Sequence, residues 1–183
     1  MSSRRVVNAK AAAAPLPLAV PAKHTAGLVT DVARFVQELG KSVDLGRIGN
    51  ATKMLKAERF QLFSDVADDD VIGVIQSQSS SGRFYSCRLS KDGDFSCCTQ
   101  NLLPCGGLRG ALCKHILVLV IGLCQSRRLD VPLALAWAGA SKAKKPVLDK
   151  DRASAIFLKH KGAEAGTVDW RPTETVPEDF YAL

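Results

Sequence analysis

The chain has 183 residues, of which 46% are hydrophobic and 23% charged, so it can bury one substantial core but not two. Its formal net charge of +7 favours an anionic partner or an acidic protein surface, although the basic residues are spread along the whole sequence. No run approaches the roughly 18 consecutive apolar residues that a membrane span requires. The longest, Ile116 to Leu123, suits a buried helix. These properties argue against a membrane protein and predict one principal domain with loose ends.

The N-terminal part of the chain is expected to be an extended lead followed by helices. Residues 1–24 are rich in alanine and proline and lack a hydrophobic period, which predicts a disordered or extended segment. Residues 25–57 should form a helical segment that packs on the core. Within it, apolar residues recur at helical spacing over about 27–39, just before Gly40, and again over about 44–57.

From residue 58 the pattern changes to short runs rich in β-branched and aromatic residues, which are typical of strands. Phe60–Leu62 and Val71–Ile75 are two such runs. The acidic triplet Asp68-Asp69-Asp70 separates them. We interpret this triplet as a solvated loop rather than a cation site, because three adjacent side chains point in different directions.

A β-hairpin is predicted next. Two alternating runs, Phe84–Leu89 and Phe95–Cys97, flank a turn that contains Asp92-Gly93, and glycine tolerates the positive φ that such turns require. Strand alternation places Tyr85, Cys87 and Leu89 on one face of the first run, and Phe95 and Cys97 on one face of the second.

A mostly apolar helix is expected from Lys114 to about Arg127, where its basic end complements the helix dipole. Residues 129–162 should form a helical extension that contains a basic linker, with helices at Pro132–Ala138 and at about 150–161. Residues 163–183 are predicted to be an extended tail. The fold class is therefore α+β: a small antiparallel sheet with a hairpin and helix, flanked by helices and flexible termini.

Four of the six cysteines fall between positions 97 and 113, close to one histidine, and this clustering indicates a metal site rather than disulfides. A structural Zn²⁺ takes four thiolate or imidazole ligands in a tetrahedron. Cys105, Cys113 and His115 supply three, and either Cys97 or Cys98 supplies the fourth. The intervening loop is rich in glycine, which lets its backbone curl back.

This cysteine pattern resembles the SWIM zinc finger family, in which a hairpin carries C-x-C and a later C-x-H leads into an apolar helix. Cys113-Lys-His115 matches the second half, whereas Thr99 stands where the second cysteine of the first half belongs. On this resemblance Cys105 replaces the missing ligand, and Cys97 keeps the family register, with Cys98 as the alternative. The likeness spans roughly 56–124 and implies a SWIM-type zinc-binding domain over 58–128.

Other chemistry is disfavoured. Cys113 and His115 could be imagined as a nucleophile and a base, but no orienting acid is apparent, so we do not expect an enzyme. Cys87 and Cys124 should pack as small apolar residues. His160 is interpreted as a surface residue.

The resemblance implies an element for protein interaction or DNA binding. The chain is accordingly predicted to be a cytoplasmic, non-catalytic zinc-binding adaptor subunit of a larger protein assembly, with no membrane contact and no small-molecule substrate. The alternative is a DNA- or RNA-binding accessory protein, although an aromatic content of 6% offers few stacking platforms for single strands. The candidate phosphate contacts are Arg83, Arg88, Lys91, Arg109, Lys114, Lys142, Lys144 and Lys145.

Overall fold

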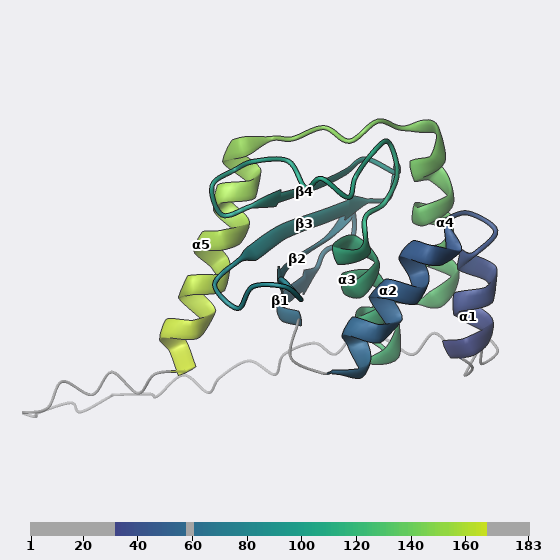
Figure 1. Cartoon of the computed structure of the whole chain (residues 1–183), viewed down its shortest axis with the longest axis horizontal. Coiled ribbons are helices and arrows are strands. Elements are labelled where there is room, and N and C mark those ends of the chain that lie inside the picture. Colours follow the sequence, from purple (N-terminus) through teal and green to yellow (C-terminus); the bar gives the residue numbers. More distant parts are fainter. Residues whose placement is uncertain (1–31, 58–60, 168–183) are drawn as a thin grey trace, which may run out of the picture.

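The computed structural model describes residues 32–57 and 61–167. Within these residues the fold is α+β, as predicted, with a four-stranded antiparallel sheet and five α-helices (Figure 1). No helix of the described part has both the length and the apolar character needed to cross a membrane. The elements are α1 (Val32–Leu39), α2 (Leu45–Lys56), β1 (Gln61–Val66), β2 (Asp70–Gln76), β3 (Phe84–Ser90), β4 (Phe95–Thr99), α3 (Lys114–Gln125), α4 (Val131–Ala140), a 3-10 turn (Ser141–Ala143) and α5 (Lys150–Thr167).

The sheet is a meander in which each strand pairs with the next one in the chain. Helices α1 to α4 gather on one side of it and α5 crosses the other (Figure 1). Because successive side chains alternate between faces, β2 contributes Val71 and Ile75 to the core that includes α3, and Ile72 and Val74 to a smaller cluster with α5. Strand β2 is thus buried on both faces.

Helix α3 lies at the centre of the larger core, and its residues from His115 to Ile121 are all buried. Gly73 of β2 lets this helix lie close to the sheet. A Cβ atom there would come within 2.6 Å of Leu119 Cδ1 and 2.7 Å of the Phe63 carbonyl oxygen. The middle of α3 can consequently pack directly on β2.

The predicted hairpin is present as β3 and β4. Cys87 pairs with Cys97 and Leu89 with Phe95, so both pairs face the core beneath α3. The turn contains Gly93 with a φ of +82°, and a Cβ atom there would meet the Ala140 carbonyl carbon at 2.4 Å. Glycine is therefore required both by the backbone angle and by the close approach of α4.

Element boundaries differ from the prediction at the two ends. The part of the first predicted helix before Val32 lies outside the described residues, as do the predicted lead segment 1–24, Phe60, and the tail after Thr167. Helix α5 does not stop at Gly162 but continues to Thr167. A single glycine costs a helix only about 1 kcal/mol, and the turns on both sides of it outweigh that cost.

Two predicted surface features are buried where α5 meets the sheet. Asp68 and Asp69 are exposed as expected, but Asp70 is only 6% exposed. Its Oδ2 atom lies 2.7 Å from Arg88 Nε and also pairs with Arg152 Nη2 of α5. Because two guanidinium groups from different elements need a shared anion, this carboxylate is enclosed rather than solvated.

His160 is also buried, against the prediction. Its ring lies 6.3 Å from that of Phe63 and 6.5 Å from that of Phe84. Its Nε2 atom lies 3.4 Å from a carboxylate oxygen of Glu164, one turn further along α5. The imidazole therefore packs α5 on the sheet, a role that the sequence pattern alone does not indicate.

We expect Asp70→Asn to lower the free energy of unfolding by about 2 kcal/mol, because it leaves two arginines without their shared charge partner. The matched control is Asp68→Asn, whose side chain is exposed and which should change stability by less than about 0.5 kcal/mol. Urea unfolding followed by circular dichroism measures both. Equal effects of the two substitutions would contradict the bridging role of Asp70.

Candidate metal centre

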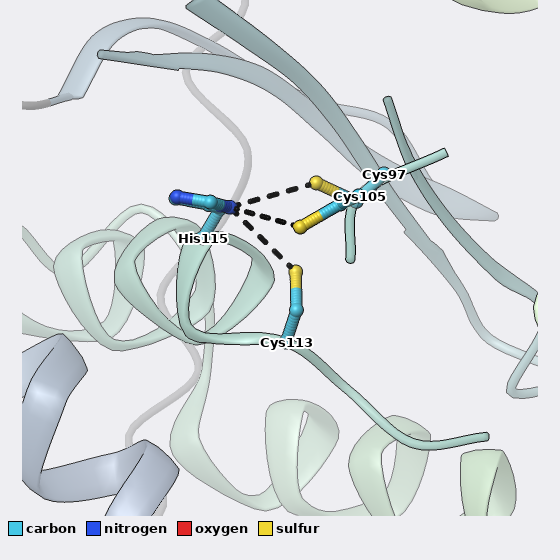
Figure 2. Close-up of side chains that lie close together, drawn as sticks. All are labelled: Cys97, Cys105, Cys113 and His115. Carbon is cyan, nitrogen blue, oxygen red and sulfur yellow. Dashed lines mark hydrogen bonds between the residues drawn. The ribbon is translucent and has the colours of Figure 1, made fainter. Parts of the chain in front are cut away.

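Four metal-ligand side chains from three parts of the fold converge in the core. Cys97 comes from β4, Cys105 from the loop after it, and Cys113 and His115 from the start of α3. Their ligand atoms all lie within 4.8 Å of one another, and all four residues are buried. Figure 2 shows the three sulfur atoms turned toward one nitrogen of the imidazole. This group could hold a metal ion.

The spacing of the ligand atoms fits a tetrahedral ion. His115 Nδ1 lies 3.4 Å from Cys105 Sγ, 3.8 Å from Cys97 Sγ and 4.0 Å from Cys113 Sγ. A tetrahedron with Zn–S of about 2.3 Å and Zn–N of about 2.0 Å has nitrogen–sulfur edges of about 3.5 Å. The observed distances bracket this value, so an ion can enter with shifts of only a few tenths of an ångström.

The chain brings Cys97 and Cys105 side by side by folding the loop back along β4. A turn closes with the Thr99 amide donating to the Leu103 carbonyl at 2.9 Å, and Leu102 within it has a φ of 56°. The Cys105 amide then donates to the Cys97 carbonyl at 2.9 Å. The edge strand thus pairs with a short antiparallel length of loop, bridged at Cys98 and Pro104, that carries the second thiol.

Cys113 is the N-cap residue of α3, and its backbone is extended with φ −82° and ψ 167°. Its side chain makes no capping hydrogen bond to the helix, so the sulfur is left directed at the cluster. His115 follows in the first helical turn. The C-x-H spacing therefore combines an extended cap with a helical residue, and this places both side chains on the sheet side of α3.

Strand alternation separates the two alternative ligands. Cys97 pairs with Cys87 on the α3 side of the sheet, whereas Cys98 pairs with Ser86 and faces the opposite side. Cys98 is buried but is not among the four clustered residues. Of the five candidate metal ligands, the structure therefore brings together Cys97, Cys105, Cys113 and His115, and not Cys98.

The electrostatics of the cluster call for a cation. Burial raises the pKa of the Cys97 and Cys113 thiols well above their ordinary value. By contrast, hydrogen bonds from Cys113 and then Cys97 lower the pKa of the Cys105 thiol. A divalent ion would stabilise all three as thiolates and release their protons.

Two neighbours support the ligands, and ligand spacing alone does not predict them. The Tyr85 ring stacks on the His115 imidazole, with ring centroids 3.8 Å apart and planes at 17°. Cys87 Sγ lies 3.7 Å from Cys97 Sγ and donates to it. Burial raises the pKa of Cys87 to about 11, so this thiol keeps its proton. Strand alternation predicted that Tyr85 and Cys87 share a face of β3, but not that this face meets His115 and Cys97.

The predicted phosphate contacts are largely engaged within the protein. Arg88 pairs with Asp70, Lys91 with Asp69 and Lys144 with Asp94. Lys142 donates to the Lys41 carbonyl and Lys114 to the Gln78 side chain. The remaining three, Arg83, Arg109 and Lys145, are exposed and make no side-chain hydrogen bond or ion pair within residues 32–57 and 61–167.

Comparisons of the chain with protein-family models, with curated proteins and with solved structures found no match. The likeness to the SWIM zinc finger therefore stands on the cysteine and histidine pattern described above.

We expect the purified chain to carry one zinc ion and Cys97→Ser to lose it, since a serine hydroxyl is a poor zinc ligand. Cys98→Ser should retain the metal, because Cys98 faces away from the cluster. Mass spectrometry of metal content on matched preparations measures this difference. Metal loss in Cys98→Ser with retention in Cys97→Ser would show that the strand register is wrong.

Proposed function

We propose that this chain is a non-catalytic zinc-binding adaptor subunit of a larger protein assembly, and that its zinc ion is structural. The observation that carries the proposal is the buried group of three thiols and one imidazole. Four protein ligands complete the tetrahedron of a structural zinc ion, whereas catalytic zinc sites keep one position open for water or substrate. A closed coordination sphere leaves no place for a reaction.

The surroundings of the cluster support the same conclusion. The described residues enclose hollows of about 140 Å³ between β2 and α5 and about 430 Å³ between α2 and α3, and other residues line both. Neither brings a substrate to the ligands. The His115 ring stacks on Tyr85 and its Nδ1 atom faces the sulfur atoms, and among residues 32–57 and 61–167 no carboxylate orients it as a base.

A role in protein assembly accounts for a small domain whose sheet is covered on both faces. The zinc ion would fix the β4 edge, the loop after it and the front of α3 as one rigid surface. The proposed partner is a protein that recognises this surface. All six cysteines are free thiols in the structure, which suits the reducing cytoplasm.

Nucleic-acid binding is the competing function. The observations in its favour are the net charge of +7 and the exposed side chains of Arg83 and Arg109. The internal ion pairs of Arg88, Lys91 and Lys144 weigh against it, because a cation that already faces a carboxylate gains less from a phosphate.

The test is binding of the zinc-loaded chain to purified proteins encoded by neighbouring genes, measured by calorimetry at physiological salt. We expect a stoichiometric complex with one of them, weakened at least tenfold by Cys113→Ser and unchanged by Cys98→Ser. The same preparation is titrated with duplex and single-stranded DNA at 50 and 200 mM salt. DNA binding that falls steeply between these concentrations, without any protein complex, would replace the adaptor proposal with the nucleic-acid one.

A further inference from the structure

Arg47 of α2 reaches into the loop that joins two of the cluster cysteines. Its Nη1 atom donates to the Leu112 carbonyl at 2.9 Å and to the Leu108 carbonyl at 3.2 Å. Both carbonyls belong to the segment between Cys105 and Cys113, more than 60 residues away along the chain. We infer that Arg47 is a positioning residue for metal retention, an inference that rests on the proposed zinc site.

Apart from the burial of Leu108 and Leu112 in the main core, the loop has only local hydrogen bonds to define the path of its backbone. Its own hydrogen bonds are all short-range: the Leu108 amide donates to the Cys105 carbonyl at 3.1 Å, the Ala111 amide to the Leu108 carbonyl at 2.7 Å, and the Gly107 amide to Cys105 Sγ at 3.4 Å. Arg109 has a φ of 33° and Gly110 a φ of 78°, in the left-handed region. A non-glycine residue held there costs about 1 kcal/mol or more, so the loop needs outside contacts to keep this path.

The position of the Leu112 carbonyl makes the contact specific to the metal site. This carbonyl and the Cys113 amide belong to one planar peptide group. Holding the oxygen fixes the plane from which the Cys113 side chain departs, and so the direction in which its sulfur points. The arginine therefore orients a ligand through one peptide group, without touching the sulfur.

The helix that carries Arg47 is itself capped and packed. The Asp44 side chain caps α2 by accepting from the Arg47 amide at 2.9 Å. Ala51 and Met54, one and two turns further along, share the face of Arg47 and are buried in the same core as α3. The guanidinium group is thus carried by a capped and packed helix, and it ties the loop to the helical layer of the fold.

The experiment compares zinc release to a colorimetric chelator from the full-length wild-type chain and from Arg47→Met. Methionine keeps an unbranched apolar stem and a good helix propensity but removes the donors. We expect release about tenfold faster, in line with the effect of losing an orienting contact next to a metal ligand. When both proteins are metal-free, amide hydrogen exchange of segment 105–113 should also be faster in Arg47→Met than in wild type.

The matched control is Arg128→Met. Arg128 donates to the Ser64 side chain at 2.7 Å and to the Ser64 carbonyl at 2.9 Å, on β1 at the far edge of the sheet. It is therefore also an arginine bound to a distant backbone carbonyl, and its loss should leave zinc release within twofold of wild type. If Arg47→Met does not fold, Arg47→Lys is judged by the same two measurements, since its ammonium group ends about one bond short of the carbonyls.

Wild-type release rates in the Arg47 variant would overturn the inference, and so would equal acceleration by the Arg128 variant, which would indicate general destabilisation. A wild-type chain that binds no zinc would overturn the metal site, and the inference would fall with it. Normal zinc binding without any protein partner would contradict only the adaptor proposal.

Discussion

The convergence of three buried thiols on one imidazole is the constraint on which the α3 side of this fold depends. It joins an edge strand, a loop with left-handed residues and the front of the central helix, which have few hydrogen bonds to one another. Structural zinc binding is worth about 10–16 kcal/mol, whereas a whole domain has a net stability of about 5–15 kcal/mol. An ion in this cluster would therefore contribute as much as the net stability of a typical domain, and the loop after β4, which lacks the pairing with β3 that holds the strand, would depend on it most.

The opposite face of the sheet is organised by different forces. There Asp70 joins Arg88 of β3 to Arg152 of α5, and the His160 ring fills the space between two phenylalanines. None of these contacts involves the cysteine cluster. The two faces of β2 thus belong to two separately stabilised layers, and loss of the metal should loosen the α3 side before the α5 side.

The sequence contained most of the cluster but not its supports. The Asp92-Gly93 turn indicates the hairpin, and the register of the SWIM resemblance favours Cys97 over Cys98. The choice between them depends on which face of β4 meets α3, and only the structure shows that Cys97 lies on this face. The contacts of Arg47 with Leu112 and of Asp70 with Arg152 join residues 65 and 82 positions apart, so no local pattern encodes them. The prediction that His160 lies on the surface is wrong for the same reason, because the burial of its side chain depends on where α5 packs on the sheet.

The distribution of charge gives the adaptor proposal its main physical advantage over nucleic-acid binding. Polyanion affinity comes from cations that exchange their loosely held counterions for phosphates. Here Lys91, Lys144 and Lys159 each face a carboxylate of the protein, at Asp69, Asp94 and Asp65. A phosphate that approaches any of these cations also approaches the paired carboxylate. Much of the attraction implied by a net charge of +7 is therefore cancelled at close range. A protein surface can instead match such alternating charges one by one, and it gains specificity from the same pairs that repel a uniform polyanion.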